Sequence, residues 1–486
     1  MPNTCENYDK KCGGCPLLAL PYPEQTAKKQ ARVSTLLGHY VPVEPLRAMR
    51  EPWHYRNKAI ATFAMQRGKL VLGLYAEGSH RVLPGCNCLL QNKALNQTLA
   101  AILDAARACR WTAYDEDRGT GLVRHAVLRA SREGKVLVTI VTARPELPGS
   151  RNFCSALRKA APWVVGIVQN INPTQTSAVL GNREKTLFGR DFVADTLCGL
   201  QFAISSRSFY QVNPVQTEVL YRTALELAAL TGKETVIDAY CGIGTIGLCA
   251  AAKAAQVIGV ERNPAAARDA AANARRNHIT NAAFVCADAT EWMMQQADKL
   301  HPDVIFLDPP RAGSTPECIA AVAKMAPKRV VYVSCDPETL ARDVVLFGRS
   351  GYRARRCIPV DLFPHTKHVE TVVLLSHKKA DSYIHIDVEF GEGEGKIPVD
   401  SIAKRAEAYK PKEKVTYKMI KEYIEAKYGF KVHTAYIAEV KRNLGLPMYD
   451  APNAVEELKQ PRKHPTAEKV EAIKDALRYF EIMEEI

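Results

Sequence analysis

The sequence predicts an α/β protein, and two patterns point to this fold class. In residues 206–378, short apolar runs alternate with alanine-rich stretches, as in a parallel sheet with crossover helices. In residues 46–205 most apolar runs are of strand length, and one helical stretch at 91–109 interrupts them. We therefore expect a mixed, mostly β region followed by an α/β region.

Five blocks organise the chain. The first carries clustered cysteines and a helix expected over 23–37, and the acidic, glycine-bearing segment 389–396 is typical of a linker. The last block is expected to be a small helical appendage, with helices over 415–428 and 433–444. The predicted blocks are residues 1–45, 46–205, 206–378, 379–396 and 397–486.

Composition narrows the function classes. With 486 residues and 47% hydrophobic content, the chain can bury ample core. Its net charge of +14 favours a polyanionic partner. No apolar run reaches membrane length and the first residues lack a signal-peptide core, so we expect a cytoplasmic protein without a membrane partner. In that compartment, clustered members of the 14 cysteines indicate metal binding rather than disulfides.

Successive strands of the α/β region end in glycine or acidic residues. The run 235–240 leads into a glycine-rich turn that opens a helix, and glycines there let the backbone approach a ligand closely. Glu261 ends the next strand and suits ribose hydroxyls, Asp288 follows the third strand, and Asp308 follows the fourth. The glycine pattern alone fits dinucleotide binders and methyltransferases equally. The Asp-Pro-Pro segment at 308–310 favours S-adenosylmethionine.

A cysteine and a carboxylate supply the chemistry of a methyl transfer to a ring carbon. Cys335 follows the apolar run 329–333 after a single serine, and Glu370 precedes the run 372–375. A thiolate that adds to C6 of uracil makes C5 nucleophilic, and a carboxylate can then remove the C5 proton. A lone cysteine is otherwise most often a small buried hydrophobe. His365 and His368 fit substrate contacts and satisfied loop histidines equally well.

Five segments together resemble the RNA uracil-C5 methyltransferases, the enzymes that make 5-methyluridine in tRNA and 23S rRNA. The resemblance covers roughly residues 5–376. The segments are 209–214 (Phe-Tyr-Gln-Val-Asn-Pro), 238–245 (Asp-Ala-Tyr-Cys-Gly-Ile-Gly-Thr), 308–311 (Asp-Pro-Pro-Arg), 334–337 (Ser-Cys-Asp-Pro) and 363–370 (Phe-Pro-His-Thr-Lys-His-Val-Glu).

The resemblance implies a Rossmann-like methyltransferase domain that uses S-adenosylmethionine, with Cys335 as nucleophile and Glu370 as proton acceptor. One departure is Asp336, where the family usually has Asn after the nucleophile; this carboxylate is expected to raise the thiol pKa or to disturb a hydrogen bond. The implied cofactor contacts are Gln211, Tyr240, Glu261 and Asp308, with Asp288 near the adenine.

A cysteine cluster near the N-terminus predicts a metal site. Cys5, Cys12 and Cys15 supply three thiolates, and Cys86 or Cys88 can supply the fourth. Spacing alone fits zinc as well as an iron–sulfur cluster. The 23S rRNA members of the family are similar here, with a [4Fe-4S] cluster whose last cysteine precedes an apolar pair and Gln. That resemblance selects Cys88 and iron–sulfur, and it favours rRNA over tRNA.

Basic residues beside strands are candidates for RNA contact. Arg56, Lys58, Arg124 and Arg129 can bind phosphates or can belong to a solvated sheet face. Many relatives have an additional N-terminal β-barrel for RNA, whereas this chain starts at the cysteines. The helical appendage, with Lys441 and Arg442 near the end of a helix, can replace this barrel as an RNA or protein contact. It can equally be a solvated helical pair without such a role.

The leading hypothesis is therefore methylation of uridine C5 in 23S rRNA by a cytoplasmic monomer whose partner is RNA and not DNA. The nearest rival is the same reaction on tRNA. Cytosine-C5 chemistry is disfavoured because Arg311 stands after Asp-Pro-Pro, where those RNA enzymes tend to place a cysteine. A rival of another class is a catalytically silent RNA-binding or ribosome-assembly factor, against which Cys335 and Glu370 argue.

Overall fold

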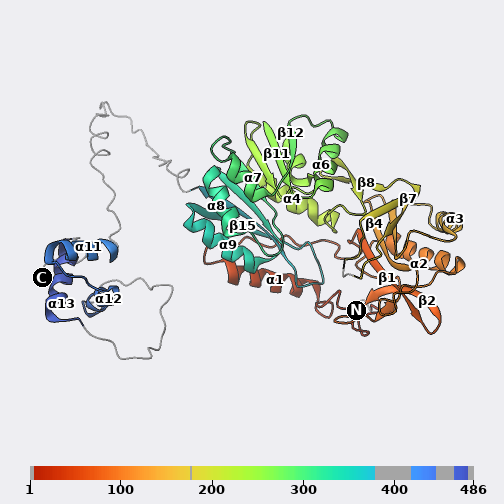
Figure 1. The fold of residues 1–486 in the computed structure, drawn as a ribbon, viewed down its shortest axis with the longest axis horizontal. Helices are drawn as coiled ribbons and strands as arrows, with labels where there is room; N and C mark the ends of the chain where they lie inside the picture. The colour runs from red at the N-terminus through yellow and green to blue at the C-terminus, as the bar shows by residue number, and fades with distance from the viewer. Residues whose placement is uncertain (1–4, 176–177, 378–416, 445–464, 480–486) are drawn as a thin grey trace, which may run out of the picture. The chain divides into compact units, whose positions relative to one another are not determined.

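The structure is a computed structural model that describes residues 5–175, 178–377, 417–444 and 465–479. The chain divides into two units, residues 1–385 and 386–486, and each is described by itself. Two seven-stranded sheets build the first unit and lie next to each other (Figure 1). No described helix has both the length and the apolar character that crossing a membrane requires.

The first sheet has the strand order β3-β2-β1-β4-β5-β6-β7, and of its pairs only β5 and β6 run parallel. Strands β4 and β5 are buried along their whole length. The reason is that helices α2 and α3 cover one face, while Leu137 and Val168 on the other face pack with the second sheet's core. The elements are β1 (Lys58–Gln66), β2 (Lys69–Tyr75), β3 (Val82–Pro84), α2 (Lys93–Ala108), β4 (Val123–Ala130), β5 (Val136–Thr142), α3 (Ser150–Ala160), β6 (Val164–Ile171) and β7 (Arg183–Gly189).

The second sheet has the order β12-β11-β10-β13-β14-β16-β15. Strands β10 to β14 are parallel, and β16 is antiparallel to both of its neighbours. The strand order reverses between β10 and β13, which opens a crevice at the carboxyl ends of these strands. This confirms the predicted α/β fold class. The strands are β10 (Thr235–Ala239), β11 (Gln256–Glu261), β12 (Ala282–Cys286), β13 (Val304–Leu307), β14 (Arg329–Ser334), β15 (Tyr352–Val360) and β16 (Glu370–His377).

Four helices around this sheet start in the same way. Each has a proline in its first turn and a preceding residue whose side chain accepts a backbone N–H, which satisfies part of the open helix end. The cap residues are Asn213, Asn263, Thr315 and Asp336. The helices of this half are α4 (Pro214–Ala228), α5 (Thr245–Ala251), α6 (Pro264–Arg276), α7 (Ala289–Gln296), α8 (Pro316–Met325) and α9 (Pro337–Arg349).

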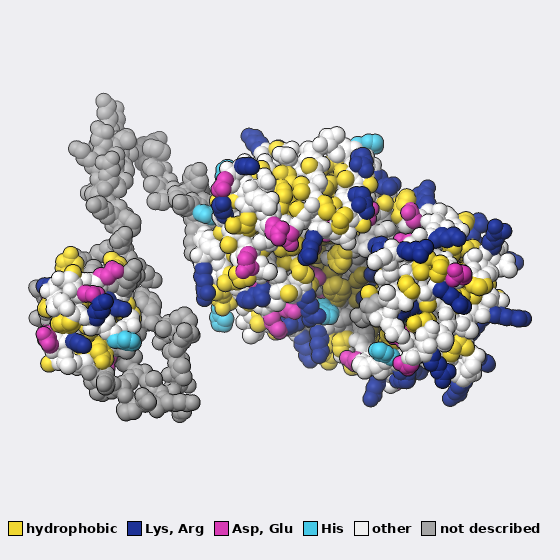
Figure 2. Space-filling view, in the orientation of Figure 1, with side chains coloured by type: hydrophobic (Ala, Val, Ile, Leu, Met, Phe, Trp, Pro, Cys, Tyr) yellow, Lys and Arg dark blue, Asp and Glu magenta, His cyan; other side chains and the backbone are white. Residues whose placement is uncertain are grey.

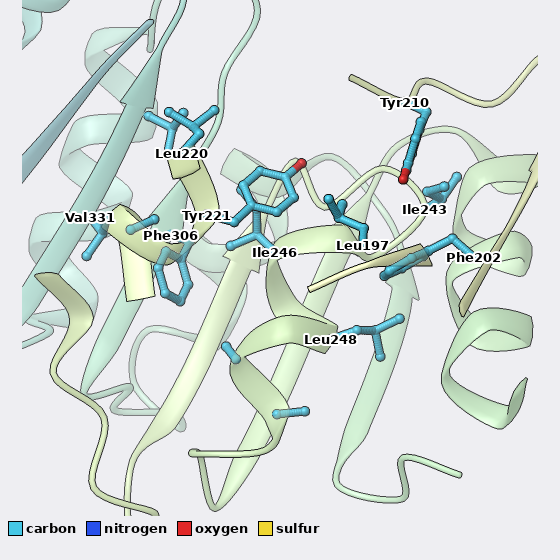
Figure 3. Packing of buried hydrophobic residues seen from close by; sticks show 14 of the residues in the cluster. Leu197, Phe202, Tyr210, Leu220, Tyr221, Ile243, Ile246, Leu248, Phe306 and Val331 are labelled. Carbon is cyan, nitrogen blue, oxygen red and sulfur yellow. The ribbon is translucent and has the colours of Figure 1, made fainter. Parts of the chain in front are cut away.

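Two segments from earlier in the chain also pack on the second sheet's half, which we call the cofactor half. The hairpin of β8 (Phe192–Leu197) and β9 (Leu200–Ser205) places Leu197 and Phe202 in its core beside Tyr221 (Figure 3). Helix α1 (Tyr22–Leu37) runs along the same half in Figure 1 and buries Val33 and Leu37 there. The cofactor half is thus assembled from more of the chain than residues 206–378.

The second unit contains α11 (Tyr417–Tyr428), α12 (Thr434–Asn443) and α13 (Ala467–Tyr479), packed around a small apolar core. The two helices predicted here are confirmed over the described residues, whereas α13 was not predicted because its charges are evenly spread. Lys441 is buried, with its ammonium 5.7 Å from the Tyr417 ring centre, so it contributes to packing. The predicted linker segment 389–396 lies outside the described residues.

Candidate active site

A cavity of about 470 Å³ lies at the carboxyl ends of β10, β11 and β13, where the strand order reverses. We call it the cofactor cavity. Of the predicted cofactor contacts, four line it: Gln211, Tyr240, Glu261 and Asp308. The predicted catalytic residues, Cys335 and Glu370, line it as well.

The loop between β10 and α5 is shaped by glycines. Gly242 and Gly244 have φ values of 56° and 83°, which glycine adopts without strain. The Gly247 N–H donates to Asp238 Oδ2 at 2.7 Å, and a Cβ on Gly247 would lie 2.9 Å from that oxygen. The backbone therefore fits closely around the buried Asp238 carboxylate beneath the loop.

Four carboxyl groups, those of Glu370, Glu261, Asp238 and Asp308, give the cofactor cavity an acidic lining. Glu261 accepts N–H groups from Gly242 at 3.0 Å and Asn263 at 2.7 Å, which fixes it at the cavity wall. Asp238 and Asp308 are enclosed by protein except toward the cavity, and burial raises the pKa of each to about 7. S-adenosylmethionine carries a sulfonium and an ammonium, so the acidic lining fits this molecule, and the position of Glu261 agrees with its predicted role toward ribose hydroxyls.

Asp288 does not line the cofactor cavity. Its side chain caps α7 by accepting the N–H groups of Thr290, at 3.0 Å, and Glu291, at 3.2 Å. Its place near the adenine stays a prediction. Tyr221 was missed at the sequence level: its hydroxyl lies 2.9 Å from Thr245 Oγ1 at the cavity. The only sequence signal for it is a tyrosine on the apolar face of a helix.

Strand pairing brings Cys335 and Glu370 together. Ser334 on β14 is the register partner of Thr371 on β16, so the residue after β14 and the first residue of β16 meet at one end of the sheet. Glu370 is 3% exposed, and burial followed by the charge of Asp308 raises its pKa to about 8. Cys335 and Glu370 therefore share one partly closed space.

The Cys335 thiol is surrounded by more negative than positive groups. Burial, then Glu370 and then Asp308 raise its pKa to about 11, and Arg311 acts in the opposite direction. Arg311 ends the Asp-Pro-Pro-Arg segment but received no predicted role. Its Nε lies 3.2 Å from Asp336 Oδ2, and Asp336 also raises the pKa of Cys335. Asp336, which stands where the family usually has Asn, was expected to raise the pKa of the thiol, and its charge beside Cys335 acts in that direction.

A second cavity of about 840 Å³, which we call the cleft, opens on the other side of Cys335. Arg311, Cys335 and Phe363 line both the cleft and the cofactor cavity. Figure 2 shows a hollow between the two sheet regions, with many Lys and Arg side chains around it. The cleft is lined by six basic residues and one acidic residue, Glu77. The basic residues are Lys28, Lys29, Arg32, Arg56, Arg311 and Lys367.

The two histidines before Glu370 differ in environment. His365 is 2% exposed and has a φ of 66°. Its ring stacks on Trp53 at 3.9 Å, and its two ring nitrogens lie within hydrogen-bond distance of Gln25 Nε2 and the Pro52 carbonyl. His365 is therefore a satisfied loop histidine. His368 is exposed and lines the cleft, where a substrate can reach it.

A third cavity, of about 320 Å³, is lined by Cys5, Cys12, Cys15 and Cys88. We call it the cysteine cavity. Burial, then Cys88, Cys12 and Cys5 raise the pKa of Cys15 to about 12. Cys86 instead packs at the edge of the first sheet's core. Among the described residues, no group of three or more metal-binding side chains is arranged to hold a single ion.

Arg56 lines both the cysteine cavity and the cleft, in agreement with a place near RNA. For Arg124 and Arg129 the prediction of an accessible basic face is wrong. Arg124 donates to the carbonyls of Asn172 and Thr174, and Arg129 donates to the Ser208 carbonyl. Both guanidinium groups are buried because these carbonyls, distant in sequence, surround them.

Comparison with known proteins identifies the family. A family model described as tRNA (Uracil-5-)-methyltransferase matches residues 179–378. An uncharacterised RNA methyltransferase of Halalkalibacterium halodurans is 43% identical over 375 residues, which cover 76% of this chain and 82% of that relative. One of Listeria innocua is 42% identical over 380 residues, which cover 77% and 83%.

A solved structure has the same fold. The Pyrococcus abyssi tRNA (uracil-54, C5)-methyltransferase, in complex with S-adenosyl-L-homocysteine, superimposes with a TM-score of 0.63 at 26% identity, covering 74% of this chain and 85% of that one. The chain belongs to the RNA uracil-C5 methyltransferase family. It is an S-adenosylmethionine-dependent enzyme that acts on RNA.

Proposed function

We propose that this enzyme methylates C5 of a uridine in 23S rRNA, with Cys335 as nucleophile and Glu370 as base. We further propose that Cys5, Cys12, Cys15 and Cys88 hold a [4Fe-4S] cluster. The observation that carries the substrate assignment is the set of four cysteines around one cavity. It matches the cysteine pattern of the 23S rRNA members that the sequence resembles.

In the first half of the reaction, a uracil base enters from the cleft and reaches Cys335. The Cys335 thiol gives its proton to solvent and the resulting thiolate adds to C6, while the electron pair of the C5–C6 double bond moves to the C4 carbonyl as an enolate. Arg311, which lowers the pKa of Cys335, favours the thiolate. When bound, S-adenosylmethionine supplies an electrophilic methyl group for C5.

In the second half, the methylated base still carries the C5 proton and the bond to sulfur. Glu370, as a carboxylate, takes the C5 proton; the electron pair of that C–H bond re-forms the C5–C6 double bond and expels the thiolate of Cys335. A pKa of about 8 makes Glu370 a stronger base than an ordinary carboxylate near neutral pH. The proton on Glu370 then leaves to solvent and the thiolate of Cys335 takes up a proton from solvent, which returns the enzyme to its starting state.

The resemblance to the 23S rRNA members favours iron–sulfur over zinc. Four cysteines line one cavity of about 320 Å³ and can supply thiolates to either metal. Burial and mutual repulsion oppose ionisation of Cys15, and a cationic metal core relieves that opposition. The cluster's expected role is structural, since the cysteine loop contributes Gly13, Gly14, Pro16 and Leu17 to the wall of the cleft.

The rival substrate is tRNA, which the Pyrococcus abyssi enzyme acts on by its name. The deciding experiment offers labelled S-adenosylmethionine with unmodified 23S rRNA and unmodified tRNA in parallel, followed by nucleoside analysis. We expect 5-methyluridine in rRNA alone, and none with Cys335→Ala. Label in tRNA alone would overturn the rRNA assignment, and transfer by Cys335→Ala would overturn the mechanism.

The cluster is tested by two matched substitutions. Cys88→Ser should lose bound metal because it removes a ligand from the cysteine cavity, whereas Cys86→Ser should retain it because Cys86 lies in a different environment. Iron, acid-labile sulfide and zinc are measured in anaerobically purified protein. Iron and sulfide in equal amounts are expected; zinc in place of iron, or metal loss with Cys86→Ser only, would refute the assignment.

A further inference from the structure

We propose that Lys28 and Lys367, together with Arg32, bind the RNA phosphates that flank the target uridine. This inference rests on the proposed function and adds a named phosphate-binding site to it. The three residues come from α1 and from the loop that leads to Glu370, and all three line the cleft that reaches Cys335.

The three side chains form a continuous basic wall. Lys28 and Arg32 are four residues apart on α1, so they share a helix face with about 6 Å between them along the axis. Arg32 Nη1 donates to the Lys367 carbonyl at 3.3 Å, which places the helix against the loop. Positive groups at successive positions along one wall suit the successive phosphates of an RNA strand.

In this basic wall, Lys28 and Lys367 carry the positive charges that can bind an anion. Arg32 is paired with Glu338 at 2.9 Å, and Arg311 across the nucleophile is paired with Asp336 at 3.2 Å. Lys28 and Lys367 are exposed, and within the described residues no ion pair joins either ammonium to a carboxylate. A pair of uncompensated ammonium groups next to a reactive thiol attracts an anionic ligand.

The ligand class follows from what the cleft must admit. A uridine in folded RNA reaches Cys335 only after it leaves its stack, and its own and neighbouring phosphates must then follow it to the cleft mouth. The methyl donor does not need these groups, because its cavity is lined by acids on the other side of Cys335. The basic wall therefore faces the RNA backbone.

The experiment compares Lys28→Ala, Lys367→Ala and the double variant with Lys159→Ala. Lys159 is an equally exposed helical lysine at the end of α3, and it does not line the cleft. Binding of unmodified 23S rRNA is measured over a range of KCl concentrations, and kcat and KM are measured with the same RNA. Within the part of the chain that the structure describes, the side chains of Lys28 and Lys367 have no ion-pair partner whose loss would disturb folding, unlike the third cleft lysine, Lys29, which pairs with Asp361.

We expect each cleft variant to raise KM roughly 3- to 10-fold, to keep kcat, and to reduce the slope of log K against log salt by about 0.7. The Lys159 variant should match the wild type. Unchanged slopes in both cleft variants, or a fall in kcat at constant KM, would overturn the phosphate site. If the wild type transfers no methyl group to rRNA, the proposed function fails, while the binding slopes still decide the phosphate contacts.

Discussion

At the scale of single residues, the surroundings of Cys335, the proposed nucleophile, oppose its ionisation. Three carboxyl groups, those of Glu370, Asp308 and Asp336, raise the pKa of Cys335 in addition to burial, and Arg311 lowers it. The same crowding makes Glu370 a stronger base. Nucleophile and base thus share an electrostatic environment, and their protonation is coupled.

Asp336→Asn should speed the reaction at neutral pH. The amide can still accept the Glu338 N–H that caps α9, but it removes one negative charge and releases Arg311 toward the thiol. We expect a lower thiol pKa and a roughly 2- to 5-fold faster single turnover at pH 7. Thiol alkylation rates from pH 6 to 10 report the pKa directly. Glu338→Gln, a neighbouring acid paired with Arg32 instead, is the control, and identical profiles for Asp336→Asn and wild type would contradict the prediction.

At the scale of elements, three segments of the chain hold the loop 363–368 in place. Gln25 on α1 accepts the His365 N–H at 3.0 Å and contacts the ring. Tyr55, just before β1, donates to the Pro364 carbonyl at 3.0 Å, and the Leu17 N–H donates to the His365 carbonyl at 3.1 Å. Helix α1, the first sheet's half and the cysteine loop therefore all fix the loop that leads into Glu370.

Gln25→Ala should reduce kcat because it frees this loop. A small displacement of a base or a substrate contact can cost about 10-fold or more in rate. Gln30→Ala is the matched control: Gln30 lies on the same helix but bonds the Glu44 carbonyl and the Leu46 N–H. Both variants should lose some stability, whereas only Gln25→Ala should lower kcat with S-adenosylhomocysteine affinity unchanged. Equal kcat values for the two would show that Gln25 does not position the loop.

An element could be predicted when its own residues carry the pattern of a helix or strand. Its packing could not be predicted when it depends on residues far away in the sequence. Strands such as β10 and β14 have a mostly apolar sequence and were predicted within a residue or two. The β8–β9 hairpin alternates buried and half-exposed residues, and its attachment to α6 depends on Asn273 and Asn277. The residues of the hairpin themselves do not indicate that it packs on α6.

The residues of the candidate site show the same contrast between local motifs and long-range contacts. Cys335 and Glu370 were predicted because their motifs are contiguous. The burial of Arg129 and the cap role of Asp288 depend on contacts that spacing does not encode. Arg311 was visible in a motif, but its effect on the thiol needs the fold.

At the scale of the whole molecule, the active site lowers stability at high pH. Glu370 has a pKa of about 8 in the folded state, above the value of 4.5 for an unperturbed glutamate. Between these values the unfolded chain releases a proton that the folded protein keeps. The contribution to stability is therefore complete below pH 4.5 and is lost as pH rises through 8.

Glu370→Gln should therefore become more stable than wild type as pH rises from 5 to 8. The difference in unfolding free energy should grow by at most about 1.4 kcal/mol per pH unit and then level off. Glu234→Gln is the contrasting variant. Although Glu234 is shielded from solvent, which raises its pKa, bonds from the Thr231 N–H and hydroxyl bring the value to about 2. Its substitution should destabilise by a constant amount from pH 5 to 8. Denaturant melts of both variants check this, and a Glu370→Gln difference that does not change with pH would refute it.

The packing of α1 determines whether the cofactor half can fold when it is separated from the rest of the chain. Lys29 on α1 forms a buried ion pair with Asp361 at 2.6 Å, and Tyr22 donates to the same carboxylate at 2.8 Å. Residues 206–378 cut out alone would lose both partners of Asp361 and expose the apolar surface that Val33 and Leu37 cover. A gene fusion that transfers the cofactor half must therefore include α1. Without α1, another helix would have to cover the exposed apolar surface and pair with Asp361.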